Sequence, residues 1–210
     1  MSAHPETLGV ILAGGLARRM GGGDKGLSVI EGRTIIERLA DGMRPQCAGL
    51  ILNANGDPGR FAALGLPVVS DSVPDFAGPL AGVLAGLDWA AAHRPELAWV
   101  ATVAGDTPFL PPDFVARLHA AGQAAGAKLA SAASGGRTHP VNGLWPVTLR
   151  EDLREALARG ERKVGRWTAE HGAALAEWSG DPDPFFNVNA PEDLDEARRL
   201  AERGGQYKAE

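Results

Sequence analysis

The sequence predicts an α/β fold, a three-layer αβα sandwich built on a mostly parallel β-sheet. Short apolar runs alternate with segments of helical spacing from the first residues onward. The first apolar run leads directly into a glycine-rich, basic loop, and the later runs end in asparagine or aspartate. Strands that alternate with helices form parallel sheets, and such sheets bind ligands at the carboxyl ends of their strands.

Six short apolar runs have the length and composition of strands. The first ends in glycines, and the next three end in polar residues that suit turns. The alternation is less regular after about residue 135, and from position alone we expect a second substrate to bind there. The expected strands are Leu8–Ala13, Gly49–Asn53, Leu66–Ser70, Trp99–Ala104, Leu129–Ala133 and Asn142–Pro146.

Four segments have the spacing or the starting residues of helices. In the first, two isoleucines, a leucine and a methionine fall on one face, and the second is apolar throughout despite its glycines. The last two open with proline and acidic residues, which suit a first helical turn. The expected helices are Thr34–Met43, Leu80–Ala92, Pro112–Gly122 and Pro191–Glu202.

The composition is that of a globular protein of one domain. We expect this domain over residues 1–203, followed by a polar tail at 204–210. Cys47 is the single cysteine, which excludes an internal disulfide and fits a reducing compartment. The sequence shows neither a signal peptide nor a membrane span, so we expect a cytoplasmic protein. The formal charge of −5 argues against nucleic acid as a partner.

The loop after the first strand has the composition of an anion-binding segment. Three adjacent glycines, residues 21–23, follow Arg18 and Arg19 and precede Lys25. A dinucleotide fingerprint at Gly21, Gly23 and Gly26 begins eight residues beyond Ala13, too far from the strand end, and Lys25 lacks the Walker A context. We therefore expect a phosphate-wrapping loop, with backbone N–H groups of Gly14 and Gly15 and the side chains of Arg19 and Lys25 facing a triphosphate. A solvated loop is the alternative.

Polar residues follow the next three expected strands. Asn53, Asp71 and Asp106 come directly after them or within two residues, and all three would meet at one edge of the sheet. Each could be a simple turn residue, but their convergence beside a basic glycine loop favours a site. Asp106 suits Mg²⁺, which is usually held by one or two carboxylates together with substrate phosphates. The histidines show no zinc-ligand spacing.

Four motifs, in order along nearly the whole chain, resemble those of the molybdenum cofactor guanylyltransferase family. They are the loop LAGGLARRMGGGDK, the block PVVSDSVPDFAGPLAGVLAGL, the block GDTPFLPPD that contains Asp106, and the closing motif FFNVNAPEDL. The first motif alone would not separate this family from sugar-phosphate or cytidylyl relatives. One departure is Gly105, where the family often has cysteine, and a small residue there is expected to leave Asp106 in place.

The resemblance implies a Rossmann-like fold of the nucleotide-diphospho-sugar transferase type and a Mg²⁺-dependent reaction. The terminal phosphate of molybdopterin would attack the α-phosphate of GTP, releasing pyrophosphate and forming the guanine dinucleotide cofactor. It implies an N-terminal part that binds GTP and a C-terminal part that binds molybdopterin. Proteins of cofactor biosynthesis or chaperones of molybdoenzymes are further partners consistent with the resemblance. We expect a monomer rather than an obligate oligomer.

The resemblance also implies roles for individual residues. Lys25, Asp106 and Arg19 would be catalytic, and Asp106 would also hold the metal. Asn187, Asn189 and the region from His139 to Asn142 would lie on the molybdopterin side. The residues expected to bind GTP are Leu12, Ala13, Gly14, Gly15, Lys25, Asn53, Asp71 and Asp106.

Three alternatives remain open. The nearest is a different nucleotidyltransferase, such as a molybdopterin cytidylyltransferase or a sugar-1-phosphate enzyme. By resemblance, Gly14-Gly15 favours the guanylyl branch, since cytidylyl relatives tend to have Ala-Gly. A non-catalytic GTP-binding regulatory protein would bind GTP without releasing pyrophosphate. An NAD-dependent oxidoreductase would require an acidic residue at the end of the second strand, where Asn53 stands.

Overall fold

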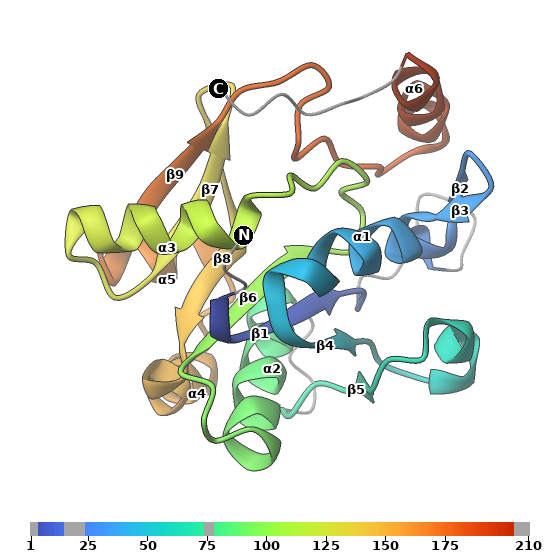
Figure 1. Ribbon diagram of the computed structural model, residues 1–210. Helices are drawn as coiled ribbons and strands as arrows, with labels where there is room; N and C mark the ends of the chain where they lie inside the picture. The colour runs from blue at the N-terminus through green and yellow to red at the C-terminus, as the bar shows by residue number, and fades with distance from the viewer. Residues whose placement is uncertain (1–3, 15–23, 74–77, 204–210) are drawn as a thin grey trace.

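The computed structural model describes residues 4–14, 24–73 and 78–203, which fold around a central β-sheet (Figure 1). The strand order is β5-β4-β1-β6-β8-β7-β9, and within these described residues only β8 runs antiparallel to its neighbours. The predicted, mostly parallel sheet is therefore confirmed. The strands are β1 (His4–Leu12), β4 (Cys47–Asn53), β5 (Val68–Val69), β6 (Trp99–Ala104), β7 (Ala130–Ser134), β8 (Arg137–Pro146) and β9 (Ala174–Trp178).

Helices cover both faces of the sheet, which confirms the predicted three layers. One hydrophobic core lies between the sheet and helices α1, α3 and α6, and a second lies between the sheet and helices α2, α4 and α5. Figure 1 shows α1 and α3 in front of the strands and α2 behind them. The helices are α1 (Ile35–Met43), α2 (Pro79–His93), α3 (Phe114–Ala125), α4 (Arg150–Ala158), α5 (Val164–Glu170) and α6 (Pro191–Glu202). No helix among the described residues is both long and apolar enough to cross a membrane.

The structure adds elements that the sequence did not predict. A small hairpin, β2 (Val29–Ile30) and β3 (Arg33–Thr34), precedes α1, and 3-10 turns occur at Lys25–Leu27, Arg44–Gln46, Pro58–Leu64 and Val147–Leu149. Helices α4 and α5 and strand β9 lie between residues 150 and 178, where the sequence predicts no element. The expected third strand shrinks to the two residues of β5, and α3 begins at Phe114 rather than at Pro112.

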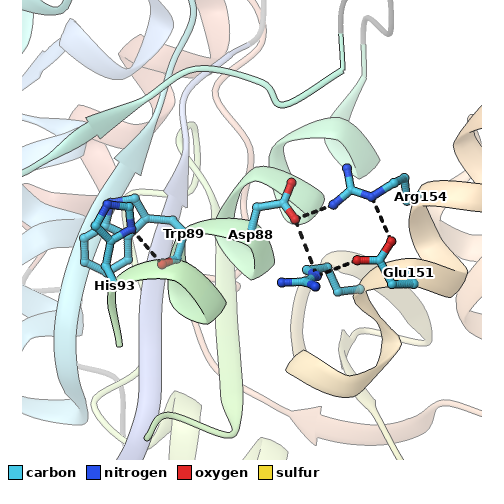
Figure 2. A network of polar contacts seen from close by, with 6 residues as sticks. Asp88, Trp89, His93, Glu151 and Arg154 are labelled. Carbon is cyan, nitrogen blue, oxygen red and sulfur yellow. Dashed lines mark hydrogen bonds and ion pairs between the residues drawn. The ribbon is translucent and has the colours of Figure 1, made fainter. Parts of the chain in front are cut away.

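A charged network joins α2 to α4 behind the sheet (Figure 2). The guanidinium of Arg154 donates to Asp88 at 2.5 Å, and the Nε of Arg150 lies 3.7 Å from the same carboxylate. Glu151 accepts from both arginines, at 2.8 Å and 3.0 Å. The network therefore links the helix that follows β5 with the C-terminal half of the chain.

The central strands end at one level, and this alignment positions the site. In the parallel ladders, Leu12 of β1 pairs with Asn53 of β4 on one side and with Ala104 of β6 on the other. The backbone continues this contact beyond the strands, since the N–H of Gly105 donates to the carbonyl of Leu12 at 2.9 Å. Residues that follow these three strands therefore meet at one edge of the sheet, as predicted.

Candidate functional site

Asn53, the last residue of β4, lies beside Asp71, which follows β5. The amide Nδ2 of Asn53 donates to Asp71 Oδ1 at 3.0 Å and to the carbonyl of Val69 at 3.1 Å. Asn55 holds the same aspartate from a second direction, because its Nδ2 donates to Asp71 Oδ2 at 2.7 Å and its Oδ1 accepts the Asp71 N–H at 2.9 Å. Two amide side chains therefore fix the orientation of one carboxylate, and Asn55 was not predicted to take part.

Helix α2 approaches Asn53 so closely that only glycine fits at position 82 of the helix. A Cβ at Gly82 would lie 2.3 Å from Asn53 Oδ1 and 3.0 Å from a methyl carbon of Leu12. A Cβ at Gly14 would lie at an ordinary 3.7 Å from the same Oδ1, and Gly14 itself is exposed. Asn53 is 3 % exposed and both of its donor hydrogens are used, so it acts on the site by holding Asp71.

Asp106 lies half-buried in the turn after β6. Burial raises the pKa of its carboxyl group above the ordinary value, and the nearby charge of Lys25 lowers that pKa in part. Its backbone carbonyl accepts the N–H of Val188 at 2.9 Å, from the segment that precedes α6. The segment before α6 therefore contacts the turn that carries Asp106.

Lys25 opens a 3-10 turn beside Asp106. Its Nζ donates to Asn189 Oδ1 at 2.7 Å, a contact between residues 164 positions apart. The next residue, Gly26, is buried, and a Cβ there would lie 2.9 Å from the carbonyl oxygen of Gly105 and 2.4 Å from a side-chain carbon of Ile36. This close backbone approach fixes the position of the lysine relative to the turn that carries Asp106.

The residue before Lys25 ties its turn to the Asn53–Asp71 side of the site. Asp24 Oδ2 lies 3.0 Å from the Nε of Arg60, in the 3-10 turn Pro58–Leu64. The guanidinium of Arg60 also donates to the backbone carbonyl of Asn55 at 2.5 Å. Lys25 and Asp71 therefore belong to one connected set of contacts.

The predicted molybdopterin-side residues lie farther along the same edge. The Nε2 of His139 is 2.9 Å from Ser134 Oγ, and the His139 ring packs on Phe185 with the centroids 5.0 Å apart. Asn187 is exposed in the segment between β9 and α6, and Asn189 contacts Lys25 as described. Asn142, at the end of the region expected on the pterin side, accepts the N–H of Ala104 on its Oδ1 at 2.7 Å and so joins β8 to the end of β6.

The structure therefore brings most of the predicted residues to one edge of the sheet. Gly15 and Arg19 lie outside the described residues. The residues that sequence reasoning missed are Asn55, Gly82 and Val188. Asn55 carried a signal, since it is an amide two residues after a strand-end amide, whereas the contact of Val188 is made by backbone alone.

The donor set at Asp106 fits a divalent cation that shares its ligands with a substrate. Carboxylate oxygens are hard donors, and a cation would stabilise the ionised form that burial disfavours. Within the described ranges, no group of three or more histidine, cysteine, aspartate or glutamate side chains could hold a metal alone. This arrangement matches Mg²⁺, which needs only one or two carboxylates when phosphate oxygens complete its coordination.

Comparison with known proteins identifies the family of this chain. The family profile of the MobA-like NTP transferase domain matches residues 9–175. A protein of Bradyrhizobium sp. (strain ORS 278) named molybdenum cofactor guanylyltransferase is 62% identical over 195 residues, covering 92% of each chain. A protein of Nitrobacter hamburgensis with the same name is 58% identical over 203 residues, covering 96% of this chain and 97% of its own.

The fold is shared with a more distant solved structure. Molybdopterin-guanine dinucleotide biosynthesis protein A from Archaeoglobus fulgidus superposes with a TM-score of 0.69 at 21% identity, over 93% of this chain and 99% of that one. At that identity the likeness concerns the fold, whereas the two bacterial relatives and the profile establish the family. The chain belongs to the MobA-like NTP transferases and, among them, to the molybdenum cofactor guanylyltransferases.

Proposed function

We propose that this protein transfers GMP from GTP to a molybdopterin-type molybdenum cofactor, forming the guanine dinucleotide cofactor and releasing pyrophosphate. The observation that carries the proposal is the placement of Lys25, which is bonded to Asn189, close enough to the half-buried Asp106 to lower its pKa, at the edge of the sheet where Asp71 is also held. The relatives at 58% and 62% identity carry the name of this activity. The fold alone would fit many nucleotidyl transfers.

The reaction needs no dedicated base from the protein. A phosphate monoester has a second pKa of about 6, so its oxygen is already an ionised nucleophile near neutral pH. That oxygen forms a bond to the α-phosphorus of GTP, the bond from this phosphorus to the bridging oxygen breaks, and pyrophosphate leaves with the electron pair. The task left to the protein is to align the two phosphates and to stabilise negative charge.

Lys25 and Asp106 divide that task. Lys25 places a positive charge beside the phosphates, and its hydrogen bond to Asn189 limits the positions that the ammonium group can take. Asp106 would hold Mg²⁺ together with phosphate oxygens of GTP, and that ion supplies charge neutralisation on the transferring group and on pyrophosphate. Arg19 and the N–H groups of Gly14 and Gly15 remain the expected additional donors to the triphosphate.

Asp71 is the residue best placed to select guanine. Guanine presents adjacent N–H donors at N1 and N2, and a carboxylate held by Asn53 and Asn55 can accept from such a pair of donors. Adenine and cytosine lack this pair of adjacent donors. The backbone of Leu12–Gly14, which runs past the same group, would line the base and the ribose.

The first test is nucleotide selectivity, measured by calorimetry with GTP, ATP, CTP and NAD, each with and without Mg²⁺. We expect a Mg²⁺-dependent preference for GTP, weakened about tenfold or more by Lys25→Ala, because a charge-assisted bond to phosphate contributes roughly 1.5–3 kcal/mol. Lys128→Ala is the matched control, since Lys128 is exposed in the connection between α3 and β7.

Each other result has a definite meaning. A preference for CTP would move the protein to the cytidylyl branch with the same mechanism. Binding of GTP without release of pyrophosphate when molybdopterin is added would identify a non-catalytic GTP-binding protein. Failure to bind any triphosphate would contradict the proposal altogether.

A further inference from the structure

Ser134, His139 and Asp183 form a hydrogen-bonded chain that the reaction described above does not use. Ser134 ends β7 and is 2 % exposed. Its Oγ donates to Asp183 Oδ1 at 2.8 Å and lies 2.9 Å from the Nε2 of His139. Asp183 is itself held in place, because the same Oδ1 accepts the backbone N–H of Phe185 at 2.8 Å.

The chain of contacts determines which nitrogen of His139 carries the proton. A hydroxyl has one hydrogen, and Ser134 directs it to the carboxylate, which can only accept. The contact between Ser134 and His139 must then be made by a proton on Nε2. In the neutral ring this leaves Nδ1 with a free lone pair, so Nδ1 is a hydrogen-bond acceptor.

His139 is suited to remain neutral near pH 7. Burial lowers the pKa of its ring below the ordinary value, Arg137 lowers it further, and Asp183 and Glu177 act in the opposite direction. The ring is half-buried and packs on Phe185, and within residues 4–14, 24–73 and 78–203 no group bonds to Nδ1. An acceptor with no partner is thereby held in one orientation at the edge of the sheet.

The position of this acceptor relative to Asp106 suits the far end of the second substrate. Along β8, His139 is three residues from Asn142, across a shift in register against β7, and Asn142 contacts the end of β6 just before Asp106. The segment from Asp183 to Asn189 connects β9 to α6 (Figure 1). It contacts Ser134 at its start, and Asp106 and Lys25 near its end. A heterocycle that carries its phosphate on a short arm can bridge these two points.

We propose that Ser134, His139 and Asp183 form a recognition site for a heterocycle that bears N–H donors, with Nδ1 of the neutral His139 as the accepting atom. The inference rests on the proposed function, under which this heterocycle is the pterin part of the second substrate. His139 is the contact residue, and Ser134 and Asp183 are positioning residues that act through it.

The first experiment measures the proton directly on the wild-type protein. A long-range nitrogen–proton correlation spectrum of the histidine rings near neutral pH distinguishes a proton on Nε2 from one on Nδ1. We expect His139 to carry its proton on Nε2, and Ser134→Ala to produce a mixture of tautomers. A proton on Nδ1, or a doubly protonated ring, in the wild type would overturn the proposal.

The second experiment separates the two edges of the ring by substitution. His139→Asn keeps an acceptor near the position of Nδ1, whereas His139→Gln keeps a partner for Ser134 and loses that acceptor. We expect His139→Gln to raise the KM for molybdopterin about tenfold, which corresponds to the loss of one hydrogen bond, and to leave the KM for GTP unchanged. We expect His139→Asn to preserve most of the affinity for molybdopterin. His93→Gln is the control, because His93 is stacked on Trp89 at the exposed end of α2 (Figure 2).

The pH dependence of the KM for molybdopterin gives an independent test. Protonation of Nδ1 removes the acceptor, so the KM of the wild type for molybdopterin should rise as the pH falls through the lowered pKa of His139. The KM of His139→Asn should rise less, because in that variant only the substrate phosphate titrates. Equal KM values for wild type and His139→Gln would refute this inference alone. Absence of molybdopterin-dependent pyrophosphate release by the wild type would instead refute the proposed function.

Discussion

At the scale of single residues, the site is built from polar side chains that form hydrogen bonds with other groups of the protein. Asn53 donates both amide hydrogens within the protein, to the carbonyl of Val69 and to Asp71 Oδ1. Asn55 donates to the other carboxylate oxygen of Asp71, Oδ2. Asp106 differs, because burial disfavours its charge and Lys25 offsets only part of that cost. Because burial disfavours the ionised carboxylate of Asp106, a bound cation would change the pKa of this group more than that of the other polar groups of the site.

Replacing Asp106 by asparagine should separate stability from activity. The raised pKa means that ionisation costs the folded state free energy, so above this pKa Asp106→Asn should unfold at the same or a higher urea concentration than the wild type. The advantage should vanish at lower pH, where the wild-type carboxyl is protonated. Turnover should fall by about 100-fold or more, because charge stabilisation is lost.

Calorimetry supplies the check on the metal assignment. Mg²⁺ should strengthen binding of GTP by the wild type and have little effect on binding by Asp106→Asn. An equal effect of Mg²⁺ on both proteins would place the ion elsewhere.

The strand-end positions were the part of the site that the sequence could predict. Asn53, Asp71 and Asp106 follow apolar runs, and the geometry of parallel sheets brings such residues together. The bond between Lys25 and Asn189 could not be predicted from spacing, since it spans 164 positions and depends on the path of the segment after β9. The close approach of Gly82 likewise depends on how α2 docks on β1 and β4.

At the scale of elements, two helical glycines that look equivalent in the sequence have opposite surroundings. In α2, a Cβ at Gly82 would lie 2.3 Å from Asn53 Oδ1, and two hydrogen bonds prevent that amide from moving. In α1, a Cβ at Gly42 would meet only Leu110, at 3.6 Å, which is ordinary contact. Helix propensity alone would favour alanine at both positions.

The pair Gly82→Ala and Gly42→Ala tests this difference. Gly42→Ala should raise the free energy of unfolding by roughly 0.5–1 kcal/mol and leave GTP binding unchanged. Gly82→Ala should displace Asn53 and Asp71 and weaken GTP binding about tenfold or more. Urea unfolding and calorimetry on both variants are the measurements, and unchanged GTP affinity in Gly82→Ala would show that Asn53 does not position the nucleoside side.

The elements that could be predicted are those with a strong local pattern. β6 and α6 were predicted with their observed bounds, because one is a continuous apolar run and the other opens with proline and two acids. α4 is a nine-residue, highly charged helix that buries Leu153, Ala156 and Leu157, and β9 is a five-residue strand rich in alanine. These two have weak intrinsic signals and form because the sheet and α2 offer surfaces to cover.

At the scale of the whole molecule, the two halves of the chain are joined in front by the Lys25–Asn189 contact and behind by the network around Asp88. The side chains of Asp88, Arg150 and Arg154 are 25%, 34% and 37% exposed, so solvent screens their interaction. The network aligns α4 with α2 more than it adds to stability.

Asp88→Asn should therefore lower the free energy of unfolding by about 1 kcal/mol or less, and the loss should disappear at about 1 M salt, where the screening length is about 3 Å. Glu155→Gln, in the more exposed Arg159–Glu155 pair, is the control and should have almost no effect. Urea unfolding at low and high salt measures both. A loss that persists at high salt would show that packing, rather than charge, joins the two helices.

The contact between Lys25 and Asn189 has a consequence for the timing of synthesis. A nascent chain that has left the ribosome as far as β6 already contains Lys25, Asp71 and four of the seven strands of the sheet, β1, β4, β5 and β6. The segment that orients the lysine and meets Asp106 is translated near the end of the chain. The assembled site therefore exists only once translation is nearly complete, and a prematurely released fragment contains Lys25 without the contact that orients it.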